Sequence, residues 1–224
     1  MPTSKKSTQK ISIVRKHPLH VPVSNKNPTG ITIRDQHPRR LHGTSLNIED
    51  IKFIVKNYNR NGLQYPTPND LHFENGNQYD ETIAIWTDYF NHKFNSIFPL
   101  HPNVVKALIA SESGFQSDPP INKVARGIAQ ITKQTFKTLQ DPKGETKDFI
   151  FYKIRQKDLL DPGIAIPMAV RWLFRKKKLA NHKLKRDPTI EELILEYKGL
   201  LKSKTSLKDK ALENFRKNYE QLDK

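Results

Sequence analysis

The chain has 224 residues, a formal net charge of +16 and no cysteine. The missing thiols exclude disulfides, zinc-thiolate sites and cysteine nucleophiles, and the positive charge indicates a polyanionic partner: nucleic acid, an acidic membrane surface or an acidic cell-wall polymer. Hydrophobic residues make up 35%, against roughly 45–50% in globular chains on a count that includes glycine, so we expect part of the chain to be unpacked.

Residues 1–44 have the composition of a basic, largely irregular N-terminal extension. Asp35 is their one acid, and the prolines argue against long helices: 2, 18, 22, 28 and 38. We expect disorder or short strands here, with weak strand-like alternation over residues 11–13 and 31–33. We expect no internal repeat.

Residues 45–224 have helical apolar periodicity and predict an all-α domain. No convincing run of paired strands interrupts it. Seven helices are expected, over about 48–58, 80–98 with Ile97 on the apolar face, 102–113, 127–139, 162–174, 190–201 and 211–222.

Glu112 interrupts the apolar stripe of the helix that opens at Pro102. Four apolar residues precede it at helical spacing: Val104, Val105, Leu108 and Ile109. A carboxylate on a core-facing stripe is costly unless it is paired or protonated. Burial and the negative helix end near Gly114 both favour the protonated form that a general acid needs. The structural alternative is a salt bridge to Arg126 or to a lysine.

Four segments carry motifs in a fixed order. Residues 112–115 read E-S-G-F, and residues 125–132 read A-R-G-I-A-Q-I-T. Residues 161–173 contain D-P-G-I-A-I and A-V-R-W-L, and Tyr197 is followed by lysine and glycine. Together they resemble the E-S-G-F, A-R-G-L-M-Q-I-T, D-P-x-x-N-I-x-x-G-x-x-Y-L and Y-N-x-G motifs of the soluble lytic transglycosylase family. That family has a lysozyme-like fold and goose-type lysozyme relatives, and the resemblance covers roughly residues 100–202.

The resemblance implies peptidoglycan as the substrate and Glu112 as the catalytic residue. Glu112 would protonate the glycosidic oxygen between N-acetylmuramic acid and N-acetylglucosamine, then take a proton from the sugar's 6-hydroxyl and leave a 1,6-anhydro product. The substrate's acetamido group would stabilise the oxocarbenium charge, so no second carboxylate is required. A lysozyme-type hydrolase would add water, usually with a second acid, and the sequence leaves five candidates: Asp118, Asp141, Glu145, Asp148 and Asp161.

The resemblance also implies a substrate-binding set. Gln130 would hydrogen-bond the sugar, Gly127 would let the backbone pass close to the substrate or to the Glu112 helix, and Tyr197 would reach the catalytic region. The structural alternatives are a solvent-facing turn residue, a helix start and a core aromatic, respectively. Phe115 is expected to pack beneath the active-site helix, and the set also includes Ser113, Phe115, Ile121 and Ala129.

Several positions depart from the family pattern. Ile121 stands where the family usually has a serine, and Ala129 replaces the methionine of the second motif. Ala165 replaces the asparagine of the third motif, and Lys198 replaces that of Y-N-x-G. These departures leave open a catalytically inactive peptidoglycan-binding or structural module, as well as the choice between transglycosylase and hydrolase.

A basic cluster over residues 171–186 is interpreted as a solvated helix face, or as a surface that attracts cell-wall carboxylates. A nucleic-acid-binding protein is a third option that rests on charge alone, because the sequence has no zinc finger, RNA-recognition signature or aromatic interleaving. It also has no Gly-rich phosphate loop and no metal-ligand spacing. We therefore expect no metal and no cofactor.

The N-terminal sequence predicts a chain made in the cytoplasm without a signal peptide, because no apolar core follows Lys5 and Lys6. No stretch approaches the roughly 20 apolar residues of a membrane span. The chain would then act on the cell wall, in the periplasm or outside the cell, after non-classical delivery or lysis. A phage-encoded wall-degrading protein fits this expectation. So does a bacteriolytic effector with a secretion machine and an immunity protein as partners.

Overall fold

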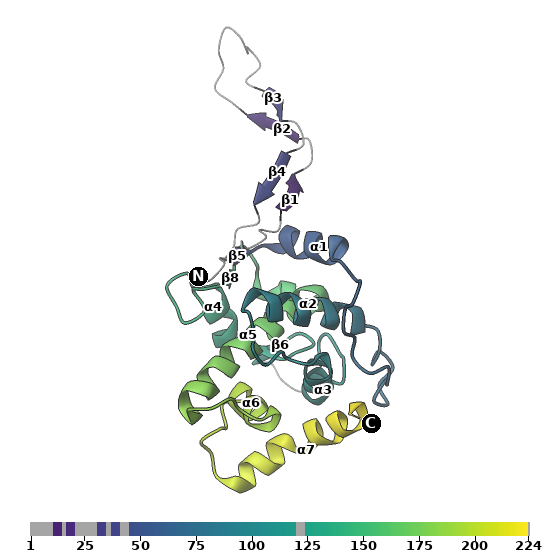
Figure 1. Ribbon diagram of the computed structural model, residues 1–224, viewed down its shortest axis with the longest axis vertical. Coiled ribbons are helices and arrows are strands. Elements are labelled where there is room, and N and C mark those ends of the chain that lie inside the picture. The colour runs from purple at the N-terminus through teal and green to yellow at the C-terminus, as the bar shows by residue number, and fades with distance from the viewer. Residues whose placement is uncertain are drawn as a thin grey trace, which may run out of the picture. The chain divides into compact units, whose positions relative to one another are not determined.

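The computed structural model describes the backbone of residues 11–14, 17–20, 31–34 and 37–40, and the whole of residues 45–119 and 124–223. The chain divides into two compact units, residues 1–44 and residues 45–224 (Figure 1). Over the described residues, none of the helices has the length and apolar character needed to cross a membrane.

The described residues of the first unit form four short strands: β1 (Ile11–Val14), β2 (His17–His20), β3 (Ile31–Arg34) and β4 (His37–Arg40). Strand β1 pairs antiparallel with β4, and β2 pairs antiparallel with β3. Strands therefore cover both segments where alternation was expected. Pro18 and Pro38 fall inside strands, which each two-stranded ladder tolerates because both of its strands are edges.

A repeat underlies these strands, so the expectation of no internal repeat is wrong. Residues 11–18 read I-S-I-V-R-K-H-P, and residues 31–38 read I-T-I-R-D-Q-H-P. The first isoleucine of each copy begins β1 or β3, and the histidine of each copy begins β2 or β4. The two copies pair with each other, the first strand of one with the second strand of the other.

The second unit is mostly helical, which confirms the all-α prediction. Its elements in chain order are β5 (Ser45–Leu46), α1 (Ile48–Asn57), α2 (Asp80–Lys93), α3 (Pro102–Ser113), β6 (Ala125–Arg126), β7 (Ile131–Thr132), α4 (Lys133–Gln140), β8 (Ile150–Phe151), the 3-10 helix η1 (Gln156–Leu160), α5 (Pro162–Leu184), α6 (Ile190–Tyr197) and α7 (Thr205–Leu222). Strands β5 and β8 form a two-residue parallel pair, and β6 and β7 form an antiparallel hairpin.

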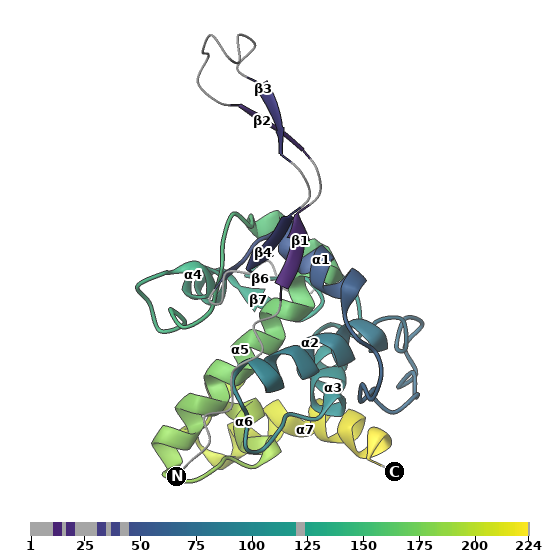
Figure 2. The same ribbon diagram turned by 45° about the horizontal axis from the view of Figure 1, so that its top comes forward.

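Helices α5 and α3 organise the core of this unit. Helix α5 packs against α2 and α6, and α3 packs against both α2 and α7 (Figure 2). Every residue of α3 from Pro102 to Ala110 is buried, so this helix is enclosed on all sides rather than along one stripe. Even Lys106 is fully buried, where its ammonium contacts the Asp80 carboxylate at 2.8 Å. The enclosed helix fixes the position of Glu112 at its C-terminal end.

Several helix boundaries differ from the prediction: the fifth helix extends to Leu184 and the seventh begins at Thr205, and three further differences have a local cause or consequence. The fourth helix begins at Lys133 instead of near Gly127, because Gly127 and Gln130 have φ values of +76° and +47°, which an α-helix cannot contain. The second ends at Lys93, and Ile97 is 88% exposed instead of lying on the apolar face. The sixth ends at Tyr197, and Gly199 turns the chain with a φ of +73°.

The capping box at the N-terminus of α6 makes the free energy of unfolding of the protein depend on pH. The Thr189 side chain accepts from the Glu192 backbone N–H, and the Glu192 carboxylate accepts from the Thr189 N–H and from Arg186. Chiefly through Arg186, these hydrogen bonds lower the pKa of Glu192 from its usual 4.5 to about 2.

A group with a lowered folded-state pKa contributes stability above its unfolded value and loses that contribution as pH falls toward the folded value. We therefore expect Glu192→Gln to lower the free energy of unfolding by about 1 kcal/mol at pH 7, reduced by solvent screening of the Arg186 pair. The difference from wild type should shrink between pH 4.5 and 2. Urea unfolding at pH 7 and pH 3 measures it, and an undiminished difference at pH 3 contradicts the prediction.

Candidate functional site

Glu112 lies one residue before the end of α3, where the helix leaves the core. His101 caps the N-terminus by accepting from the Asn103 N–H at 3.1 Å. At the other end Gly114 adopts a left-handed φ of +58°, and its N–H donates to the Ala110 carbonyl. This C-cap ends the helix as the sequence predicted, and the Glu112 side chain is 18% exposed. The carboxylate therefore stands at the boundary between core and solvent.

Lys198 forms an ion pair with Glu112. Its ammonium donates to Glu112 Oε1, and the Lys198 side chain is 20% exposed. Lys198 is the C-cap residue of α6, so the pair joins the C-terminal ends of two helices. The sequence offered Arg126 or a lysine as the salt-bridge partner of Glu112, and the partner in the structure is a lysine. Arg126 is exposed and makes no ion pair within the described part of the chain.

The turn of the β6–β7 hairpin accepts hydrogen bonds from the residues next to Glu112 and Lys198. The Ser113 hydroxyl, next to Glu112 in sequence, donates to the Ile128 carbonyl at 2.6 Å. The Tyr197 hydroxyl, next to Lys198 in sequence, donates to the Ala129 carbonyl at 3.1 Å. The adjacent carbonyls of Ile128 and Ala129 therefore accept from the sequence neighbours of Glu112 and Lys198. The ends of α3 and α6 and the hairpin turn form a single junction.

Gly127 allows the hairpin turn to approach η1. A Cβ at this position would lie 2.1 Å from the Leu159 carbonyl oxygen and 3.2 Å from the Ala165 Cβ. The close approach is therefore to η1 and the start of α5, not to the Glu112 helix. No side chain fits at this position without moving the turn.

Gln130 closes the same turn. Its backbone N–H and its side-chain amide both donate to the Gly127 carbonyl, at 2.9 and 3.0 Å. The residue is half-buried and has a left-handed φ of +47°. Its amide donor is thus engaged within the turn, and contact with a sugar stays a prediction.

Two residues of the expected substrate-binding set have no accessible side chain. Phe115 is 1% exposed, and its ring packs edge-to-face on Phe73 with centroids 5.7 Å apart. Ala129 is fully buried, and its carbonyl accepts from Tyr197. Neither side chain is therefore open to solvent: Phe115 packs in the core, in line with the expected packing, and Ala129 belongs to the buried turn. Contact of either residue with a saccharide stays a prediction. Ile121 lies outside the described residues.

Tyr197 is a hydrogen-bond donor that stays neutral. Removal of its hydroxyl from water raises its pKa, and the charge of Glu112 adds to this effect. The hydroxyl therefore keeps its proton at neutral pH and holds the Ala129 carbonyl.

We expect Tyr197→Phe to lower the free energy of unfolding by about 1 kcal/mol, since one buried carbonyl loses its donor. Tyr219→Phe is the matched control, because that ring stacks on Phe215 through its faces and needs no hydroxyl. Chemical denaturation of both variants compares them. Equal effects of the two substitutions would show that the hairpin contact contributes nothing.

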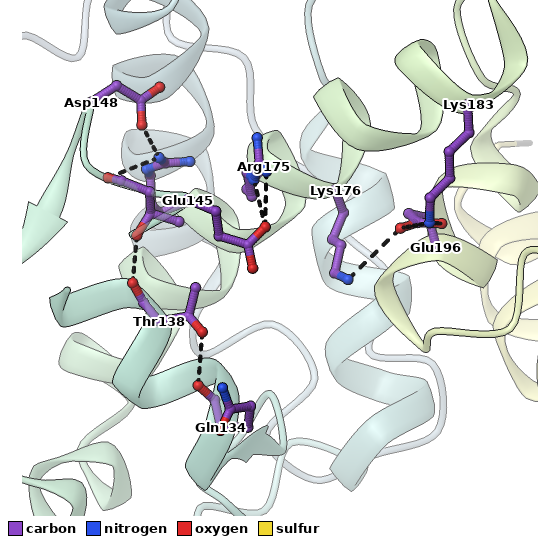
Figure 3. Close-up of polar contacts among 10 residues, drawn as sticks. Gln134, Thr138, Glu145, Asp148, Arg175, Lys176, Lys183 and Glu196 are labelled. Carbon is purple, nitrogen blue, oxygen red and sulfur yellow. Dashed lines mark hydrogen bonds and ion pairs between the residues drawn. The ribbon is translucent and has the colours of Figure 1, made fainter. Parts of the chain in front are cut away.

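The basic cluster of residues 171–186 is largely paired with acids. Arg171 is 1% exposed and contacts Asp148 at 2.6 Å, so its assignment to a solvated face is wrong. Figure 3 shows Arg175 directed at Glu145, and Lys176 and Lys183 directed at Glu196 from two sides. Because these acids neutralise much of the cluster, less of its charge is available to a polyanion.

The five candidates for a second acid make no hydrogen bond or ion pair with Glu112 among the described residues. Four of them have structural partners elsewhere. Glu145 and Asp148 pair with arginines of α5, Asp161 accepts from the Gly163 N–H at the start of α5, and Asp141 accepts from the Lys143 N–H. Asp118 is exposed. The contacts of the described residues therefore single out none of the five as a second acid, and that role stays a prediction.

One cavity lies away from Glu112 and the β6–β7 hairpin, and Asp148 is among the residues that line it. It has a volume of about 700 Å³ and is lined mainly by the segment that follows α2 and by residues 171–181 of α5, among them Phe94, Phe98, Arg171 and Phe174. Arg171 is the one motif residue among those that line it, and we place the candidate site at Glu112 because the polar contacts of three elements converge there. Within the described residues, no group of three or more histidines and acids could hold a metal ion.

Comparison with known protein families matches the part of the chain that contains Glu112 and the β6–β7 hairpin. Residues 91–190 match a family model described as the transglycosylase SLT domain. The match spans α3, the β6–β7 hairpin and α5, and it ends at the start of α6. No curated protein matches the chain in sequence.

Proposed function

Because residues 91–190 belong to the transglycosylase SLT domain family, we propose that the chain is a peptidoglycan lytic transglycosylase with Glu112 as its general acid and base. The observation that carries the proposal is the junction around Glu112. The one carboxylate of the first motif stands at the solvent boundary, and the second motif is fastened beside it through Ser113 and Tyr197.

In the proposed reaction, the Glu112 carboxyl donates its proton to the glycosidic oxygen that links N-acetylmuramic acid to N-acetylglucosamine. The bond from the muramic acid C1 to that oxygen breaks, and the acetamido group stabilises the positive charge at C1. The Glu112 carboxylate then accepts the proton of the 6-hydroxyl as O6 bonds to C1. The product ends in a 1,6-anhydro ring, and Glu112 regains its proton.

This route needs one carboxylate, which Glu112 supplies, whereas hydrolysis with two acids needs a second one that no contact of the described residues assigns. The two carboxyl groups of a retaining hydrolase stand roughly 5–5.5 Å apart, and those of an inverting one roughly 6.5–9.5 Å apart. Four of the five sequence candidates are engaged in contacts with α5 or with their own loop. The transglycosylase needs one carboxylate only.

A second candidate function is a peptidoglycan-binding module without activity. The Glu112–Lys198 pair favours it, because a carboxylate that stays paired cannot donate a proton. Delivery to the cell wall by a phage or by a secretion machine stays a prediction in both cases.

Incubation of purified sacculi with wild type and with Glu112→Gln separates the two functions. The transglycosylase proposal expects soluble muropeptides from wild type, and binding without release from the variant. Binding without release by both proteins would support the inactive module.

A further inference from the structure

Lys198 is the one polar partner of the Glu112 carboxylate among the described residues. It occupies the position at which the Y-N-x-G motif has asparagine, so the chain places a positive charge where the motif has a neutral amide. Both side chains are partly open to solvent, at 20% for Lys198 and 18% for Glu112. The ammonium can therefore meet a ligand that reaches Glu112.

The surroundings of Lys198 are negative. Helices α3 and α6 both end at the pair, and neither has a basic residue in its last turn. Helix C-termini carry partial negative charge on their unpaired carbonyls. Lys198 thus compensates two helix ends as well as the Glu112 carboxylate.

The proposed reaction requires this pair to open. When Glu112 carries the proton that it donates, its carboxyl is neutral and Lys198 loses its counter-charge. The neighbouring hydroxyls are already engaged, Ser113 with Ile128 and Tyr197 with Ala129. Glu196, the acid of α6 nearest to Lys198 in sequence, is buried and paired with Lys183. The described residues thus supply no second anion to Lys198.

We propose that Lys198 binds a carboxylate of the glycan substrate in exchange for Glu112, so that the site prefers strands with a free carboxylate beside the cleaved bond. This inference rests on the proposed function of Glu112. Peptidoglycan has two sources of such a group. One is the lactyl carboxylate of muramic acid in a strand without peptides, and the other is a carboxylate of the peptide stem.

Three substrates test the inference: peptide-free glycan strands, the same strands with their lactyl carboxylates capped as methylamides, and peptide-bearing strands. In Lys198→Asn we expect KM for the free-carboxylate strands to rise about tenfold, since a charge-assisted hydrogen bond is lost. On the capped strands, which offer Lys198 no carboxylate, KM should not rise, and any change in kcat there reports only the loss of the Glu112 pair. Lys198→Arg, which keeps the cation, should keep the preference.

Lys202→Asn is the matched control, because Lys202 is exposed, four residues further along the chain, and belongs to no part of the junction. Whichever strand wild type prefers, peptide-free or peptide-bearing, identifies the source of the carboxylate. If Lys198→Asn changes cleavage of free and capped strands by the same factor, in either direction, then Lys198 acts only on Glu112 and the inference is wrong.

Binding without turnover separates this inference from the proposed function. The affinities of Glu112→Gln and of Glu112→Gln with Lys198→Asn are compared on the free and capped strands. We expect the double variant to bind the free-carboxylate strands at least about fivefold more weakly, and the capped strands equally well. Equal affinity of the two variants for the free strands overturns the inference even if wild type cleaves them. Failure of wild type to cleave any strand overturns the proposed function alone.

Discussion

Glu112→Gln is expected to reduce kcat on purified peptidoglycan by about 10²–10⁴-fold, the contribution typical of a positioned general acid or base. Glutamine keeps the length of the side chain and can accept from Lys198, but it has no proton to donate to a glycosidic oxygen and cannot accept one from the 6-hydroxyl. Release of soluble muropeptides over time measures the loss. Circular dichroism and a thermal melt show whether the variant is folded.

Glu213→Gln is the control for Glu112→Gln. It makes the same chemical change on an exposed residue of α7, so its kcat should equal that of wild type. A Glu112→Gln protein that is as active as Glu213→Gln would remove Glu112 from the mechanism.

Gly127→Ala has the second large expected effect, on both stability and activity. Alanine at a φ of +76° costs about 1–2 kcal/mol from the left-handed conformation alone. Its Cβ would also lie 2.1 Å from the Leu159 carbonyl oxygen, which forces the turn away from η1. We expect a total loss of about 3 kcal/mol, because overpacking adds roughly 1–3 kcal/mol to the conformational cost. The displaced turn also moves the carbonyls that Ser113 and Tyr197 hold, so activity should fall.

Gly62→Ala separates the two causes. Gly62 has nearly the same φ, +74°, but a Cβ there meets nothing within 4 Å. Its loss of stability should therefore be about 1–2 kcal/mol, from backbone conformation alone, with activity unchanged. Chemical denaturation of both variants gives the difference, and equal losses would mean that the contact with Leu159 relaxes at no cost.

The sequence predicted those features that depend on local patterns. Helix α3 could be read from Pro102, its apolar spacing and Gly114, and its observed bounds agree with the predicted ones. Motif order identified the segments that meet at the junction, since Ser113, Gly127 and Tyr197 were all in the expected set. The sequence predicted that the backbone at Gly127 makes a close approach, with the substrate or the Glu112 helix as the expected partner. In the structure the partner is Leu159.

Features that depend on tertiary contacts could not be predicted from the sequence. Apolar spacing continues from Gly127 into α4 and resembles a longer helix, but positive φ values at Gly127 and Gln130 form a turn instead. The sequence pattern places Arg171 among solvent-facing cations, whereas its side chain is buried and its guanidinium reaches the exposed carboxylate of Asp148.

Lys198 was noted as a departure from the motif. Its contact with Glu112 joins residues that are 86 positions apart and depends on how α6 ends beside α3. The missed strand repeat is a different case. Its copies share isoleucines and a His-Pro pair at fixed spacing, so a direct comparison of residues 11–18 with 31–38 would have found it.

The central claim is that Glu112 cleaves the glycan strand by transglycosylation, and the masses of the soluble products test it most directly. Purified peptidoglycan is digested by wild type and by Glu112→Gln, and the muropeptides are resolved by mass spectrometry. We predict that wild type releases products lighter by one water than reducing-end muropeptides, as a 1,6-anhydro end requires, and that the variant releases none. No soluble product from wild type, or the same products from Glu112→Gln, would contradict the claim.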